Sequence, residues 1–368
     1  MMRRKTRFVC VSDTHGYTPS EAGFRLPAGD VLIHAGDLTN QGSISELRKT
    51  MDWIAAADYE VKIVICGNHD ITLSTPFCTQ HHGQFHNQAA PNPEEFQALV
   101  ANASPSIVFL QHQSALVRLR KPNGPNTVFK VFGSPYSQCT GEWAFLYEPD
   151  KAEELWRGIP LDSDIVVTHM PPRLHCGMGD GAVGGCEGLR GRLEMVRPGL
   201  AVCGHVHKLR GCERVRWRAR ATKDEHANEG EGVEDQVVKC ALPPQGSKKQ
   251  SLVDLTGKRA ARLDNDGWWF SRAGASFKDS FGSQDVVMLP SQDPKVDQGR
   301  VMGASHPSCP AGDEAHTRYT DAGCLRAQRH ETCVVNAAIM ASNWPHRGGR
   351  KFHPGPIVVD LELPVWRE

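Results

Sequence analysis

Five short apolar stretches of this sequence are each followed at once by residues that can bind a metal ion. In an extended segment residues i and i+2 lie on the same side, so Asp13 with His15 and His205 with His207 can each face one site. Oxygen and imidazole ligands without thiolates suit Mn, Fe, Zn or Mg. One such pair alone is more often a pair of surface or turn residues, whereas five in succession favour a metal site. In chain order the residues are Asp13, His15, Asp37, Asn68, His69, His169, His205 and His207.

The apolar stretches are short and rich in Val and Ile, which is typical of strands buried on both faces. Residues 42–57 repeat apolar side chains at helical spacing behind Ser43 or Ser45 as the cap, and residues 92–103 predict a second helix capped by Asn92. Strands alternating with helices at this spacing predict an α/β domain. Functional groups of such sheets collect at the carboxyl ends of strands, so the five loops can converge on one crevice. The predicted strands span residues 7–12, 31–34, 61–66, 127–133, 164–169 and 200–204.

The composition changes after about residue 220. Residues 221–330 are rich in Gly, Ser, Asp and Lys without a clear period, and we predict a polar, largely disordered or loosely packed insertion there. Two strand-like runs follow within residues 331–368 and could close a sheet. The predicted organisation is therefore a core at 1–220, the insertion at 221–330, and C-terminal strands at 331–368 that complete the core.

Composition excludes several classes of partner. The 42 basic and 42 acidic residues give a formal charge of zero, which argues against a nucleic-acid or membrane partner, and no stretch approaches the length of a membrane span. The twelve cysteines form no CxxC pair, and several lie in apolar runs, which favours a reducing, cytoplasmic setting. Residues 211–220, GCERVRWRAR, alternate Arg with apolar residues, as in a strand with one buried face; a nucleic-acid contact is the weaker alternative.

Two further histidine-containing segments have a structural interpretation beside a functional one. The run HHGQFH holds His81, His82 and His86, and we expect a solvated loop there, which could include a substrate contact, in preference to another metal site. The Gly-rich residues 177–188 lack the spacing of a nucleotide-binding loop and are predicted to form a flexible loop over the site. His175 before them is either a substrate contact or a turn residue.

Taken in order, D-x-H, G-D, G-N-H-D, a lone His and G-H-x-H resemble the motifs of the calcineurin-like metallophosphoesterase superfamily. The longer stretches GDLTNQGS, GNHDITL, VFGSPYSQ, THMPPRLH and CGHVHKLRGCERVRW are similar to its fungal branch related to the mammalian metallophosphoesterase-domain-containing proteins. The resemblance covers roughly residues 7–218 and 331–365. It implies a four-layer α/β/β/α sandwich of two mixed sheets, with the metal centre where the strand-end loops meet.

The resemblance also implies two divalent metal ions and a role for each motif residue. A hydroxide held between the ions would attack the phosphorus in line. His69 matches the histidine of the family that is not a ligand, and it would protonate or stabilise the leaving oxygen. The implied ligands are Asp13, His15 and His207 for one ion, Asn68, His169 and His205 for the other, and Asp37 between them.

The stretch GDLTNQG departs from the pattern of the protein Ser/Thr phosphatases, which have Asp and Arg where this chain has Asn40 and Gln41. Gln41 cannot form the bidentate pair with a phosphate dianion that Arg provides, and this favours a diester. Asn40 can hydrogen-bond His69 but offers no charge to an imidazolium. We therefore expect a metal-dependent phosphodiesterase acting on a small-molecule or nucleotide phosphoester. The alternatives are a phosphomonoesterase or protein phosphatase, and a metal-binding scaffold with little turnover; the complete ligand set argues against the scaffold.

Overall fold

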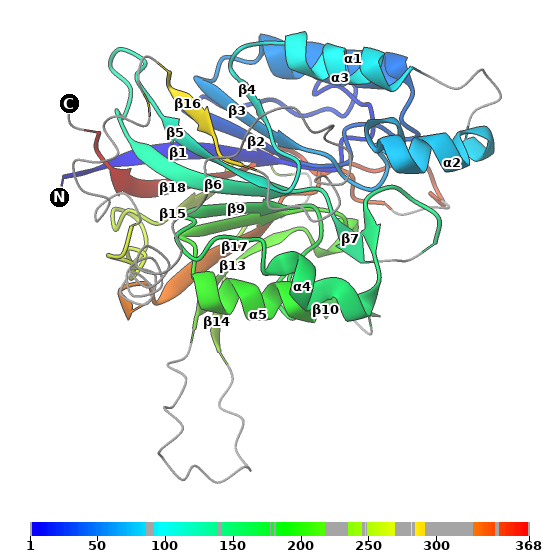
Figure 1. Ribbon diagram of the computed structural model, residues 1–368. Coiled ribbons are helices and arrows are strands. Elements are labelled where there is room, and N and C mark those ends of the chain that lie inside the picture. The colour runs from blue at the N-terminus through cyan, green and yellow to red at the C-terminus, as the bar shows by residue number, and fades with distance from the viewer. Residues whose placement is uncertain are drawn as a thin grey trace, which may run out of the picture.

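A computed structural model describes residues 2–366, except for eleven internal gaps. The chain forms two large mixed β-sheets that lie face to face (Figure 1). The residues outside the description are 86–91, 139–140, 177, 180–181, 218–234, 245–246, 248, 269–280, 282–283, 291–326 and 343–345, together with the two ends.

The first sheet has six strands, of which β1, β2, β3 and β4 are parallel to one another. Its order is β15-β18-β1-β2-β3-β4, with β18 antiparallel to β1. The register pairs Phe8 with Val31 across β1 and β2 and with Val359 across β1 and β18. The strands are β1 (Arg3–Val11), β2 (Val31–Ala35), β3 (Val61–Ile65), β4 (Ile107–Phe109), β15 (Ser251–Asp254) and β18 (Ile357–Pro364).

The second sheet has eight strands in the order β14-β13-β17-β12-β9-β6-β5-β16. Its centre is parallel, from β17 through β12 and β9 to β6, and antiparallel strands flank it on both sides. The strands are β5 (Gln113–Arg118), β6 (Val128–Ser134), β9 (Ile165–Thr168), β12 (Leu200–Cys203), β13 (Gly211–Arg216), β14 (Gln236–Lys239), β16 (Val286–Met288) and β17 (Glu331–Asn336).

Helices cover the outer face of each sheet, so the molecule has four layers (Figure 1). The outer face of the first sheet carries α1 (Ile44–Ala56) and α3 (Pro93–Asn102), and that of the second carries α4 (Ala152–Trp156) and α5 (Glu187–Val196). The predicted α/β/β/α sandwich is confirmed. The remaining elements are η1 (Ile71–Leu73), α2 (Thr75–Phe85), β7 (Ser137–Gln138), β8 (Leu146–Tyr147), η2 (Pro149–Lys151), β10 (Met178–Gly179), β11 (Ala182–Val183) and η3 (His207–Leu209).

Alternation along the strands builds three apolar layers. In β1, Phe8 and Cys10 pack between the two sheets, while Val9 and Val11 pack beneath α1 and α3. Because both faces of the strand are buried, an uninterrupted apolar run is what this position requires. The third layer joins the second sheet to α4 and α5.

The two predicted helices lie close to their predicted bounds. Ser43 is the N-cap of α1, and it forms a reciprocal capping box with Glu46. The Asn92 side chain accepts a hydrogen bond from the Glu94 amide at the start of α3. Within the described residues, none of the helices combines the length and the apolar composition that crossing a bilayer requires.

Three short strands come from the range predicted as an insertion, 221–330. β14 and β16 are the two edges of the second sheet, β15 is an edge of the first, and Leu255, Leu263 and Trp268 are buried between the sheets. The sequence pattern does not predict these strands, because each spans at most four residues. Most of the rest of the range lies outside the described residues, so the domain boundaries stay a prediction.

Candidate metal centre

The loops that follow β1, β2, β3, β9 and β12 meet at one end of the sandwich. The structure brings together the seven side chains predicted as ligands, and each lies within 3.7 Å of at least one other member of the set. They form two groups with one carboxylate between them.

The first group contains Asp13, His15 and His207. His207 Nε2 lies 3.1 Å from His15 Nε2 and 3.3 Å from Asp13 Oδ1. His207 Nδ1 donates to the Ser342 carbonyl at 3.0 Å, which leaves Nε2 with its lone pair in the neutral ring. Together with Asp37, one ligand atom from each of these residues lies within 4.8 Å of the others. Two imidazole nitrogens and two carboxylates facing one point suit a divalent cation.

The second group contains Asn68, His169 and His205. Asn68 Oδ1 lies 3.1 Å from His169 Nε2 and 2.9 Å from His205 Nδ1. His169 Nδ1 donates to the Ala35 carbonyl at 2.9 Å, so in the neutral ring its Nε2 also faces the group with a lone pair.

Asp37 lies between the two groups. Its Oδ1 is 3.3 Å from His169 Nε2, and its Oδ2 is 3.7 Å from His15 Nε2. The His69 amide donates to Oδ1 at 2.9 Å and fixes the carboxylate in this orientation. One carboxylate therefore offers one oxygen to each group.

The backbone around the cluster is unusual. Asp13, His15, Asp37 and His205 all have φ between 46° and 66°, a region that residues other than Gly rarely adopt. Such angles persist where the surrounding structure enforces them, and they gather at functional sites. At the end of β12, a Cβ on Gly204 would overlap Ser12 Oγ and Asp13 Oδ2, so the close approach of the loops needs glycine there.

Burial and neighbouring charges set the protonation of Asp13, His15 and His205. Burial lowers the pKa of His15 to about 3 and that of His205 to about 4. For Asp13 burial acts in the opposite direction, but the hydrogen bond and charge of His207 lower its pKa to about 2. At neutral pH His15 and His205 are therefore neutral imidazoles beside the Asp13 carboxylate, and neutral imidazole is the state that metal binding requires.

Asp37 and His169 form a charged pair in the second group. Burial alone would lower the pKa of His169, but the Asp37 carboxylate raises it to about 9. Burial alone would raise the pKa of Asp37, and the charges of His169 and His69 hold it well below its usual value. His169 therefore carries a proton on Nε2, the nitrogen that faces Asp37, and a metal cation can replace this proton.

His69 lies beside the cluster without joining either group. Its Nδ1 donates to the backbone carbonyl of Asn40 at 2.7 Å, so the predicted partner residue is correct but its side chain is not what contacts the ring. The ring of Trp143 covers His69 with the centroids 4.0 Å apart and the planes at 34°. The loop of Trp143 is tied to the cluster, because the Ala144 amide donates to the Asn68 carbonyl at 3.2 Å.

Sequence reasoning assigned no role to Trp143 or Asp70. Asp70 is buried and accepts hydrogen bonds from the amides of Leu38, Thr39 and Gly67 at 3.2, 2.9 and 2.8 Å. It therefore joins the loop after β2 to the loop after β3. Its place in GNHD was a usable signal, whereas no local pattern points to Trp143.

The other histidine segments lie away from the cluster's ligands. The loop predicted for HHGQFH is wrong for His81 and His82, which belong to α2, and His86 lies outside the described residues. His175 is 2% exposed, with Glu213 at 3.7 Å and the Trp217 ring at 5.5 Å. This buried position favours the structural alternative over a substrate contact.

Two of the alternating arginines are paired with carboxylates. Arg214 and Arg216 contact Glu331 at 2.6 and 3.3 Å, and Arg216 also contacts Asp264 at 2.5 Å. Paired guanidinium groups are poorly placed to meet the phosphates of a nucleic acid.

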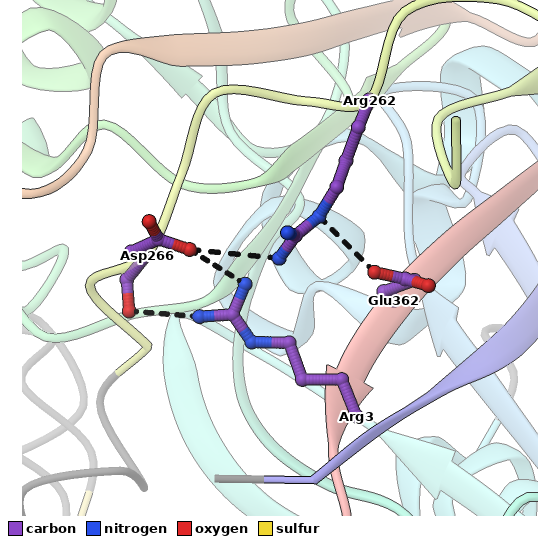
Figure 2. A pocket seen from close by; sticks show the side chains of 4 residues that line it. All are labelled: Arg3, Arg262, Asp266 and Glu362. Atoms are coloured by element: carbon purple, nitrogen blue, oxygen red, sulfur yellow. Dashed lines mark hydrogen bonds and ion pairs between the residues drawn. The ribbon is translucent and has the colours of Figure 1, made fainter.

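A surface hollow lined by Arg3, Arg262, Asp266 and Glu362 lies far from the cluster (Figure 2). Its four charges are paired, with Arg3 to Asp266 at 2.8 Å and Arg262 to Glu362 at 3.1 Å. Arg3 begins β1, whereas the metal cluster follows the other end of that strand, roughly 30 Å away at the rise of an extended chain. The hollow therefore takes no part in the metal centre.

Comparison with known proteins agrees with this geometry. The family model of the calcineurin-like phosphoesterases matches residues 6–209. The chain is 40% identical over 223 residues to a probable rhamnogalacturonate lyase C of Emericella nidulans, covering 59% of this chain and 19% of that protein. It is 36% identical over 217 residues to metallophosphoesterase domain-containing protein 1 of Homo sapiens, and the match covers 55% of this chain and 61% of that protein. A UPF0046 protein of Caenorhabditis elegans is 30% identical over 217 residues, and the match covers 57% of this chain and 72% of that protein. The match thus spans less than two thirds of the first two relatives.

Proposed function

Because the chain belongs to the calcineurin-like phosphoesterases, we propose that it is a metal-dependent phosphodiesterase with two divalent ions held by the seven clustered side chains. The observation that carries the proposal is Asp37, which directs one carboxylate oxygen toward each group. Asp37 would be a ligand that both ions share. The ligands are Asp13, His15 and His207 on one side and Asn68, His169 and His205 on the other.

The ions supply Lewis acidity to the phosphoryl oxygens and lower the pKa of water near the phosphorus. The chain's own residues position the ester and handle the leaving group. His69 is the proposed general acid, because its Nδ1 is held by the Asn40 carbonyl and its other nitrogen is the one that can pass a proton to the leaving oxygen.

The preference for a diester rests on Gln41. Its backbone amide contacts Glu46 at the start of α1, and its neutral side chain stands where the phosphatases have Arg. A diester carries one negative charge fewer than a monoester, so it needs this arginine less. The proposed substrate is a small-molecule or nucleotide phosphodiester, and the proposed ions are Mn, Fe, Zn or Mg.

A cytoplasmic location is also proposed. It is supported by the cysteines: all nine in the described part of the chain are free, and eight of them are buried. A reducing compartment keeps cysteines in that state.

The test is hydrolysis of bis-p-nitrophenyl phosphate with manganese by the wild type and by Asp37→Asn. We expect the variant to lose about 100-fold or more of the rate, because both ions lose their shared ligand. Asp52→Asn, at an exposed position on α1, is the matched control and should keep full activity. Equal rates for the wild type and Asp37→Asn would refute the enzymatic proposal.

A second assay separates the ester classes. The same proteins are given p-nitrophenyl phosphate, a monoester with the same leaving group. A strong preference for the monoester would contradict the argument from Gln41. Elemental analysis of the purified protein identifies the ions, and bound metal without hydrolysis of either ester would favour the scaffold alternative.

A further inference from the structure

A hairpin beside the metal centre presents a group of basic side chains. Its described residues are 339–342 and 346–353, and we refer to these two segments as the C-terminal hairpin. Its two arms are joined by hydrogen bonds from Ala341 to Lys351 at 2.7 Å and from His353 to Ile339 at 2.8 Å. Its base is fixed to the end of β1, since the Ile339 amide donates to the Ser12 carbonyl at 2.8 Å.

The hairpin contacts the metal cluster directly. The Ser342 carbonyl accepts the hydrogen bond from His207 Nδ1, and the Ser342 hydroxyl lies 2.9 Å from His346 Nδ1. The segment that carries the basic residues is therefore held at a fixed place relative to one of the proposed ligands.

The sequence of the hairpin's end is His-Arg-Gly-Gly-Arg-Lys, residues 346–351. Arg347, Arg350 and Lys351 are exposed, and none of the three forms an ion pair with any carboxylate in the described parts of the chain. Other exposed basic residues of the fold do form such pairs; Lys49, for example, contacts Glu21 at 3.1 Å. The end of the hairpin therefore carries uncompensated positive charge.

Arg350 is the basic residue whose position is fixed. Its guanidinium lies over the Tyr17 ring, 5.4 Å from the centroid, and donates to the Tyr17 hydroxyl. Tyr17 packs against Phe352 with the centroids 5.0 Å apart, and it follows the proposed ligand His15 by two residues. The contact with Tyr17 uses one of the five N–H donors of the guanidinium, and the fixed orientation reduces the entropy lost on binding an anion.

We propose that Arg350 forms a subsite for a second anionic group of the substrate. This inference rests on the proposed function. The preferred substrates are phosphodiesters that carry a further phosphate or carboxylate beside the scissile ester. The chemistry is that of a guanidinium with an oxyanion, in which paired N–H donors match two oxygens. This chain has Gln41 where the phosphatases have an arginine. Arg350, from a distant part of the sequence, provides a cation instead.

The alternative is that Arg350 only fastens Tyr17 to the hairpin. In that case its loss would affect all substrates alike, because the damage would reach the loop of His15. In a subsite its loss affects only substrates that carry the second anion. The two roles are therefore separated by a pair of substrates that differ in that one group.

The experiment uses thymidine 5′-(p-nitrophenyl phosphate) with and without a 3′-phosphate, with manganese. We expect Arg350→Gln to reduce kcat/KM for the 3′-phosphorylated diester by about 10- to 100-fold, mainly through KM, and for the plain diester by less than about 3-fold. Arg350→Lys should keep part of the preference. Arg4→Gln, an exposed arginine near the other end of β1, is the control and should change neither value.

An equal loss on both diesters, or no loss on either, would overturn the subsite. A direct measurement keeps the test independent of turnover: calorimetric binding of thymidine 3′,5′-bisphosphate and of thymidine 5′-phosphate to the manganese-loaded protein. Tighter binding of the bisphosphate that disappears in Arg350→Gln supports the subsite even if no ester is hydrolysed. Failure of the wild type to distinguish the two ligands refutes it, whatever the outcome of the hydrolysis assay.

Discussion

At the scale of single residues, two separate contacts hold His69: a hydrogen bond from its Nδ1 and the packing of its ring against Trp143. Its Nδ1 is bound by a backbone carbonyl, so any side chain at position 40 could leave that hydrogen bond in place. Its ring plane is set by Trp143, a contact that only the identity of the side chain can provide. The orientation of the proposed general acid should therefore depend on residue 143 and not on residue 40.

This difference can be measured with esters of different leaving groups. We expect Trp143→Ala to reduce kcat about 10-fold or more for a diester with an alkoxide leaving group, which needs a proton, and much less for a p-nitrophenyl diester. Trp143→Phe should restore most of the rate because it keeps a ring over His69. Asn40→Ala is the control and should behave as the wild type. A loss of the same size with both leaving groups would show that Trp143 acts on the loop and not on proton transfer.

A second residue-scale prediction concerns acid stability. His34 in β2 is buried, with Nε2 2.9 Å from Thr14 Oγ1, and burial lowers its pKa to about 4. In the unfolded chain its pKa is near 6.5, so between pH 6.5 and 4 the unfolded state binds a proton that the folded state does not. The contribution of neutral His34 is complete above pH 6.5 and is lost as the pH falls, by about 3 kcal/mol by pH 4.

Urea unfolding at several pH values, with a chelator present, tests this prediction. His34→Gln lacks the titrating group, so its free energy of unfolding should fall less steeply with acid than that of the wild type. Parallel curves for the two proteins between pH 7 and pH 4 would contradict it.

The residues of the site also differ in how well the sequence predicts their positions. Asp13, His15 and the other clustered side chains follow strands directly, so a strand prediction is enough to place them at one end of a sheet. Trp143 and Arg350 reach the site from loops whose course depends on tertiary packing. Their contacts with His69 and Tyr17 join residues far apart in the sequence, and no local pattern encodes such a contact.

At the scale of elements, the strand ends determine how closely the two sheets approach at the cluster. Gly67 after β3 and Gly204 after β12 have no room for a Cβ, because Asp37 and Asp13 occupy that space. Side chains at these two positions would push the loops apart and separate the ligands.

We expect Gly204→Ala to reduce hydrolysis by about 100-fold through displaced ligands and to destabilise the fold by about 1–3 kcal/mol through overpacking. Gly191→Ala is the matched control: the position lies within α5, where a Cβ would meet nothing within 4 Å. That change should stabilise the fold by about 0.5–1 kcal/mol and leave the rate unchanged. Activity assays and thermal unfolding of the two variants decide the matter, and full activity in Gly204→Ala would disprove the role of the close approach.

The elements differ in how well their sequences predict them. α1 carries both a capping box and an apolar stripe, and its predicted start agrees with the structure. α2, with the sequence TPFCTQHHGQF, has no apolar stripe and no acidic residue in its first turn, and the loop predicted at its residues His81 and His82 was wrong. Its helical state depends on its surroundings more than on its own composition.

At the scale of the whole molecule, the cluster joins the two sheets. Buried carboxylates such as Asp13 and Asp37 are costly without a cation, so an ion bound between the groups should stabilise the whole sandwich. Ligand binding to the folded state alone contributes about 3 kcal/mol at a concentration 100 times Kd.

We expect manganese to raise the Tm of chelator-treated protein by roughly 5 °C, which is what that free energy gives for a chain of this size. Differential scanning calorimetry before and after adding the metal measures it, and Asp37→Asn is the control that should show little shift. An equal shift in the variant would mean that manganese binds elsewhere.

At the scale of the whole molecule, runs such as VKIVIC, typical of strands covered on both faces, predicted the α/β class, and the family resemblance implied the four-layer sandwich; both were correct. The sequence predicted the two C-terminal strands but not which sheet each of them joins. They were expected to close a sheet, and the structure puts β17 in one sheet and β18 in the other. Strand order depends on pairings between distant segments, which residue patterns do not specify.

The interior positions of β17 and β18 affect how the chain can fold during its synthesis. Until residues 331–364 have left the ribosome, β1 and β12 are open sheet edges and β13 has no neighbour linking it to β12. A nascent chain that has emerged only as far as β16 therefore holds two incomplete sheets whose exposed edges can pair with other chains. Chaperone capture of such intermediates should end when β18 inserts between β15 and β1.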